Sequence, residues 1–187
     1  RGRDLDSVSQ GEGLEIFPSL RQSLEGLAGA SYLAELVDAF TPDEDPNPRV
    51  FDLLLETLGM IGGNHDFVAI RAFEVKLVSL LGYRPGLDAC VLCGSPPEGE
   101  KACFAPHHGG IVCTKCRAGS GGGLEIRRGT LENLKALLRW ETGRVYQICP
   151  DAAASREIKE MMGRFIEYHL EKGIKSRKFQ DLITKDE

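Results

Sequence analysis

Apolar residues recur every three or four positions along much of the chain, the spacing that lines one face of an α-helix. The sequence predicts a first helix over 18–40, a second over 48–61 and a third over 66–81. Asn47 and Pro48 support the second start, because asparagine caps helices and proline fits the first helical turn. Three apolar faces in succession predict a helical bundle.

The same spacing returns in the last third of the chain. We expect Thr130 to cap a leucine-rich helix that Gly143 closes. A last long helix carries an apolar face from Ile158 to Leu170, and Gly173 is predicted to end or bend it. The helical body is therefore expected to resume after an interruption in the middle of the chain.

The interruption has the pattern of short strands. KACFAP at 101–106 and GGIVC at 109–113 are predicted to pair as a hairpin joined at the turn HHGG. The glycine-rich SGGG at 120–123 is a flexible exit. An inserted β-hairpin module over 88–123 is the expected result.

Four cysteines flank this hairpin in two CxxC pairs, CVLC and CTKC, that are nineteen residues apart. This spacing is typical of a tetrahedral zinc site. We predict one structural Zn²⁺ ion with four thiolate ligands, Cys90, Cys93, Cys113 and Cys116. Four sulfurs fill the coordination shell and leave no position for a catalytic water. The predicted fold class is mainly α, a helical bundle with an inserted four-cysteine zinc-ribbon-like β-hairpin module.

Disulfides, or a site that has lost its metal, are the alternatives for these cysteines. The paired arrangement favours metal binding in a reducing cytoplasm. Cys103 and Cys149 are predicted to be small buried hydrophobes. We expect His107 and His108 to be solvated at the hairpin turn, and His169 to pack on the apolar face of the last helix.

The 187 residues carry a net charge of −5 that is unevenly distributed along the chain. Residues 1–89 hold 7 basic and 15 acidic side chains, whereas residues 127–187 hold 13 basic and 10 acidic ones. The distal part is therefore the one suited to phosphates. No apolar run approaches the roughly 18 residues of a membrane span, so we expect a soluble, cytoplasmic protein.

The distal cations have two interpretations, a binding surface or a solvated face with intrahelical ion pairs such as Glu160 with Arg164. The cluster that begins at Lys175 favours the first. The candidates for DNA contacts are Arg127, Arg128, Lys175, Arg177 and Lys178. The sequence contains no phosphate-binding glycine loop and no nucleophile elbow, which disfavours an enzyme and a small-molecule substrate.

The order of these parts resembles the bacterial recombination mediator family RecO from about residue 14 to residue 179. The most specific pieces are LLGYRPGLDACVLCG at 80–94 and YHLEKGIKSRKF at 168–179. Members of that family have an amino-terminal oligonucleotide-binding barrel followed by a helical domain, often with a four-cysteine zinc module. The resemblance implies that residues 1–17 are a remnant of the barrel and its linker, and that residues 18–187 form the helical domain.

The resemblance also implies a role in DNA repair and recombination. RecO proteins bind single- and double-stranded DNA, anneal strands coated by single-stranded-DNA-binding protein, and load RecA together with RecR. The phenylalanine-ended acidic tail of the single-stranded-DNA-binding protein is expected to dock on the helical part. Such a tail needs an apolar pocket and a cation for its carboxylate. The candidates for that cation are Arg139, Arg164 and Lys172.

Two other functions compete with a non-enzymatic mediator. A stand-alone zinc-ribbon nucleic-acid-binding module would use the distal cations as its main phosphate contacts and need no partner tail. A metal-dependent hydrolase would need an open zinc position, which four thiolates do not leave.

Overall fold

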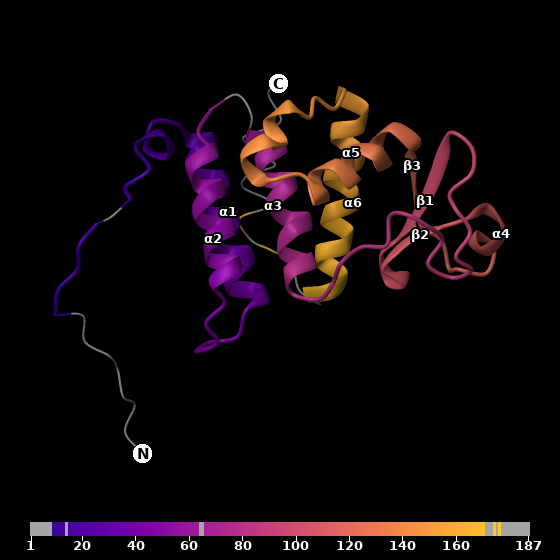
Figure 1. Cartoon of the computed structure of the whole chain (residues 1–187), viewed down its shortest axis with the longest axis horizontal. Coiled ribbons are helices and arrows are strands. Elements are labelled where there is room, and N and C mark those ends of the chain that lie inside the picture. Colours follow the sequence, from indigo (N-terminus) through magenta and orange to yellow (C-terminus); the bar gives the residue numbers. More distant parts are fainter. Residues whose placement is uncertain (1–8, 14, 64–65, 171–173, 175, 177–187) are drawn as a thin grey trace, which may run out of the picture.

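The computed structural model describes residues 9–13, 15–63, 66–170, 174 and 176. The chain folds as a helical body that carries a small sheet at one end, seen on the right of Figure 1. The five long helices are α1 (Leu24–Phe40), α2 (Pro48–Met60), α3 (Asp66–Leu80), α5 (Arg128–Arg139) and α6 (Ala152–Leu170). The mainly helical class is confirmed.

The start of the first helix differs from the prediction. A separate 3-10 turn, η1 (Pro18–Arg21), precedes α1, and Ser23 then caps α1 by accepting a hydrogen bond of 2.8 Å from the amide of Gly26. The second start is as predicted, since the Asn47 side chain accepts from the amide of Val50. The apolar spacing alone placed the helix start too early, because it does not take into account that Ser23 can cap a helix.

Helix α3 is the centre of the body. It contacts each of the other four long helices, and ten of its fifteen residues are buried. Two of the buried residues are charged: Arg71 and Glu74 form an ion pair of 2.9 Å, and the Tyr32 hydroxyl donates to the same carboxylate. Arg71 and Glu74 lie where neighbouring elements cover the helix, so the two charges pair inside the core.

The sheet has three antiparallel strands in the order β2-β1-β3. The predicted hairpin corresponds to β1 (Lys101–Ala105) and β2 (Gly110–Val112), joined by the 3-10 turn η2 (Pro106–His108). A third strand, β3 (Leu124–Arg127), was not predicted, because it is only four residues long and follows a glycine run. On the helical side, Phe104 of β1 packs edge-on against Phe165 of α6, with ring centroids 5.6 Å apart. The sheet and the helices therefore share one core.

Two predicted features of the helix α5 region are wrong. Thr130 does not cap α5, which already begins at Arg128. Thr130 is instead buried, and its hydroxyl donates to Glu157 of α6. Gly143 does not close α5, which ends at Arg139, and lies inside a further 3-10 turn, η3 (Thr142–Gln147). Because the Thr130 hydroxyl bonds to a residue of another helix, it does not cap its own helix.

Of the two isolated cysteines, Cys103 is buried as predicted, whereas Cys149 is exposed and the prediction for it is wrong. The predicted end of α6 at Gly173 lies outside the described residues, as does most of the predicted barrel remnant. Among the helices that are described, none combines the length and apolar character of a bilayer span.

Candidate functional site

The first cysteine pair is held in place by backbone hydrogen bonds to β2. The amide of Gly86 donates to the carbonyl of Gly109, and the amide of Ile111 donates to the carbonyl of Gly86, each over 2.8 Å. A Cβ on Gly110 would lie 2.4 Å from the Gly86 oxygen, so only glycine permits this approach. The amide of Val91 then bonds to the Ile111 carbonyl, which fixes the first cysteine pair beside the sheet.

Each cysteine pair is a tight turn that directs two sulfurs to the same point. In the first, the amide of Cys90 donates to the carbonyl of Ser95 over 2.8 Å. In the second, Cys113 precedes the single turn α4 (Thr114–Arg117), and its carbonyl accepts from the amide of Cys116. All four predicted ligands converge as a result, with their sulfurs within 4.8 Å of one another.

The donor set fits a zinc ion. Four sulfurs at about 2.3 Å from a tetrahedral zinc lie about 3.8 Å from each other. The Cys93 and Cys113 sulfurs are 3.6 Å apart, close to that separation. Burial falls from Cys90, which is buried, to Cys93, which is exposed, so the cluster lies at the edge of the module.

The thiols have unequal acidities. Backbone amides, led by that of Cys113, lower the pKa of the Cys90 thiol to about 6. Hydrogen bonds among neighbouring thiols, led by the one with Cys113, raise the pKa of Cys116 to about 12. Four sulfurs packed this closely cannot all ionise by themselves, and a divalent cation among them supplies the compensating charge.

A pocket opens beside the cluster. Its lining includes the buried thiol of Cys103, whose pKa is raised by burial. Lys101 and Arg117 also line the pocket, and both form ion pairs with Glu125 of β3, at 2.6 and 3.1 Å. Glu125 thereby neutralises part of the positive charge of the lining.

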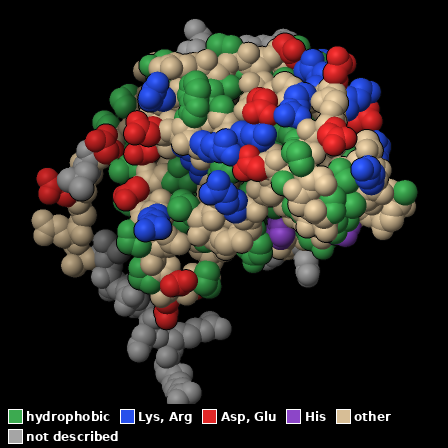
Figure 2. Space-filling view, turned by 45° about the vertical axis from the view of Figure 1, so that its right-hand side comes forward, with side chains coloured by type: hydrophobic (Ala, Val, Ile, Leu, Met, Phe, Trp, Pro, Cys, Tyr) green, Lys and Arg blue, Asp and Glu red, His purple; other side chains and the backbone are tan. Residues whose placement is uncertain are grey.

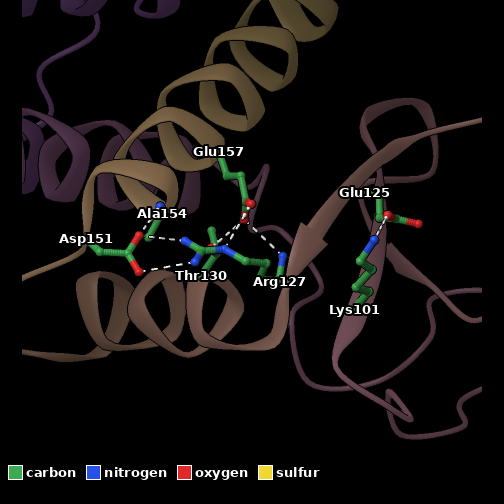
Figure 3. Close-up of polar contacts among 7 residues, drawn as sticks. All are labelled: Lys101, Glu125, Arg127, Thr130, Asp151, Ala154 and Glu157. Carbon is green, nitrogen blue, oxygen red and sulfur yellow. Dashed lines mark hydrogen bonds and ion pairs between the residues drawn. The ribbon is translucent and has the colours of Figure 1, made fainter.

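The sheet is fastened to the last helix by Arg127 (Figure 3). Its guanidinium bonds to both Asp151 oxygens, the shorter contact being 2.7 Å, and its backbone amide donates to Glu157 over 2.9 Å. Thr130 donates to the same Glu157 carboxylate. Arg127 was predicted to contact DNA, and the structure places it half-buried within these ion pairs. The sequence could not reveal its acidic partners, which lie 24 and 30 residues further along the chain.

The ion pair with Arg127 is expected to lower the pKa of Asp151. The Arg127 guanidinium lowers the pKa of Asp151 to about 2. A lowered carboxyl pKa stabilises the fold above the ordinary value of about 3.9, and that contribution is lost as the pH falls through about 2. In Arg127→Gln, the Asp151 pKa measured by NMR should return toward about 3.9. An Asp151 that titrates identically in both proteins would contradict the contact.

The other predicted cations are scattered. Arg128 donates to the carbonyl of Pro97, Arg139 pairs with Asp88 at 2.6 Å, and Arg164 pairs with Glu160 as predicted. Figure 2 accordingly shows Lys and Arg side chains interspersed with Asp and Glu over one face. The remaining predicted cations, Lys172, Lys175, Arg177 and Lys178, lie outside the described residues.

Among the described residues, the group within metal-binding distance consists of the four cysteines and includes no histidine. His107 is exposed as predicted and bonds to the carbonyl of Ser120. His169 packs between Tyr83 and Phe165, with ring centroids 4.5 Å away in each case, as expected of a packing histidine. Burial lowers the pKa of His169.

Comparison with known proteins gives consistent matches. The family model described as "Recombination protein O C terminal" matches residues 21–178. A protein named DNA repair protein RecO from Pelotomaculum thermopropionicum is 43% identical over 181 residues, covering 97% of this chain and 70% of that relative. Relatives of the same name from Desulforamulus reducens and Symbiobacterium thermophilum are 36% and 37% identical, over 99% and 97% of this chain and 72% and 74% of their own lengths.

Proposed function

This chain belongs to the RecO family of DNA repair proteins, and we propose that it acts as a non-enzymatic mediator that binds DNA and partner proteins. The observation that carries the proposal is the family match over residues 21–178, which spans the helical body and the cysteine cluster together. In this proposal the protein works in the bacterial cytoplasm at the nucleoid.

The cysteine cluster has a structural role in this proposal. Cys90, Cys93, Cys113 and Cys116 would hold one Zn²⁺ ion, whose chemistry is to link the two cysteine turns into a fixed unit. With four protein sulfurs, the ion has no position left for a substrate oxygen. The chain's own residues then supply surfaces for binding rather than groups for turnover.

DNA contacts are assigned to the distal cations. Arg128 is exposed, and Lys175, Arg177 and Lys178 form a dense basic run in the sequence. Arg127 would have to exchange Asp151 for a phosphate, because its guanidinium is engaged with that carboxylate. Phosphate neutralisation of this kind gives affinity without sequence preference and makes it depend steeply on salt.

Charge reversal of the basic run is expected to weaken DNA binding. The variant Lys175→Glu, Arg177→Glu, Lys178→Glu should lower the affinity for single-stranded DNA and reduce the salt slope by about 0.7 for each lost phosphate contact. Fluorescence anisotropy at several salt concentrations measures both quantities.

A matched control changes the same number of charges elsewhere. Arg21→Glu, Arg49→Glu and Arg84→Glu reverse three exposed cations in the acidic first half of the chain. We expect the control to change affinity through net charge but to leave the slope near that of the unaltered protein. If the two triple variants had equal salt slopes, the basic run would not contact DNA phosphates.

The acidic tail of the single-stranded-DNA-binding protein is proposed to bind this chain at Arg139, Arg164 and Lys172. Arg139 and Arg164 are exposed, and their ion pairs with Asp88 and Glu160 are of the weak surface kind that a carboxylate ligand can replace. A labelled acidic peptide ending in phenylalanine should bind, and the same peptide with an amidated end should bind less tightly. Equal affinity for the two peptides would contradict capture of the terminal carboxylate.

The mediator role itself is tested by strand annealing. Complementary strands coated by single-stranded-DNA-binding protein should anneal faster with this chain than without it. Addition of RecR should then speed the loading of RecA onto the coated strand. Annealing at the uncatalysed rate would contradict the proposed function.

A further inference from the structure

An aromatic and basic turn runs from the end of α5 through η3. Trp140, the single tryptophan of the chain, follows the last residue of α5, and its side chain is 39% exposed. Tyr146 in η3 is 45% exposed. The guanidinium of Arg144 lies over the Trp140 ring, 5.9 Å from its centroid. Two large rings and a stacked cation are thus presented to solvent by one short segment.

Two other side chains of the turn are buried more deeply than these rings. The apolar anchors of the segment are Val145 and Ile148, which are buried, with exposed fractions of 0% and 6%. Scattered exposed hydrophobic residues are normal, but here the inward positions of the turn are already filled by other side chains. The exposed part of the Trp140 ring can therefore be reached by a ligand.

The turn is also held rigidly. The amine of Lys76 on α3 donates to the Trp140 carbonyl over 2.6 Å and to the Thr142 hydroxyl over 3.1 Å. The amide of Trp140 closes the last turn of α5 by donating to the Ala136 carbonyl. A ring on a fixed backbone loses little conformational entropy when a flat ligand stacks on it.

We propose that the Trp140–Arg144–Tyr146 turn is a stacking site for the unpaired bases of single-stranded DNA, an inference that rests on the proposed function and assigns it a surface. Every base has a π-face, so tryptophan, tyrosine and a planar guanidinium accept bases regardless of sequence. Arg144 forms no ion pair with another described residue and can also reach a phosphate. Duplex bases are stacked on each other and are closed to the site.

The local charge predicts how this contact responds to salt. Glu141 lies next to Trp140, and Glu56 of α2 interacts with Lys76, so the turn is not a strongly basic patch. Stacking should therefore supply most of its affinity, and loss of the Trp140 ring should leave the salt slope nearly unchanged. This separates the site from the basic run, whose loss changes the slope.

The single tryptophan makes the test direct in the full chain. Oligothymidylate should quench the fluorescence of Trp140, and a blunt duplex at equal phosphate concentration should leave it unchanged. Trp140→Ala should weaken oligothymidylate binding about tenfold with duplex affinity unaltered, and Trp140→Phe should retain part of the affinity. Phe51→Ala, which removes a 63% exposed aromatic ring from α2, is the matched control and should bind like the unaltered protein.

The outcomes distinguish this inference from the proposed function. If the unaltered chain binds oligothymidylate without quenching and Trp140→Ala binds equally well, the stacking site is wrong and the DNA-binding function stands. If the unaltered chain binds neither oligothymidylate nor duplex, both the stacking site and the proposed DNA-binding function are wrong. Because quenching is measured on the unaltered protein, misfolding of a variant cannot decide the result.

Discussion

Under the proposed assignment of a zinc site, replacing Cys113 by serine is expected to lower the zinc content and to loosen the two cysteine turns. Structural zinc sites contribute about 10–16 kcal/mol of apparent binding free energy, and three thiolates hold the ion much less tightly than four. The apolar cluster that surrounds the sulfurs is small, with only Cys90, Ala105 and Val112 fully buried, so it cannot replace the metal. The strands themselves share the core of the helical body and should stay ordered.

This expectation is measured as zinc content per chain and as hydrogen exchange. Protection should fall in the segments that carry the cysteine pairs, 88–100 and 113–123, while α3 and α6 keep theirs. Cys149→Ser is the matched control, because Cys149 is exposed and lies outside the cluster. One bound zinc per chain and unchanged protection in Cys113→Ser would contradict the assignment of this residue as a ligand.

Replacing Glu74 by alanine is expected to destabilise the helical body strongly. It leaves the Arg71 guanidinium, only 3% exposed, in the core without the carboxylate that now lies 2.9 Å away. Breaking a buried ion pair by removing one partner costs about 3–5 kcal/mol. The Tyr32 hydroxyl also loses its acceptor. The melting temperature of a chain this long should drop by roughly 6–20 °C.

Two further variants test the cause of that loss. Glu160→Ala breaks an exposed ion pair with Arg164 and should cost at most about 1 kcal/mol. The double variant Arg71→Met, Glu74→Leu removes both charges and should be more stable than Glu74→Ala alone. Thermal unfolding followed by circular dichroism measures all three. If Glu74→Ala melted at the same temperature as Glu160→Ala, the buried ion pair would not be what stabilises α3.

The features that the sequence predicted correctly depend on local chemistry. Asn47 and Pro48 identified the start of α2 because capping involves neighbours a few residues apart. The two CxxC pairs identified the four cysteines of the cluster because each pair is a turn with a fixed direction. The strands β1 and β2 were predicted from two short runs on either side of the HHGG turn.

The features that were missed or mistaken depend on distant contacts. Thr130 has the sequence context of a cap, but its hydroxyl is used by Glu157, 27 residues away. Arg127 looked like a free cation because Asp151 and Glu157 are remote in sequence. The burial of Arg71 and Glu74 follows from the packing of α3 against neighbours on all sides, whereas an amphipathic pattern suggests one polar face.

The proposed binding of DNA without strand cleavage is tested by titrating end-labelled single-stranded DNA with the protein at two salt concentrations. We then examine the recovered strand by gel electrophoresis. We expect the logarithm of the affinity to fall linearly with the logarithm of the salt concentration, and the strand to keep its length. No binding at low salt, or a shortened strand, would contradict it.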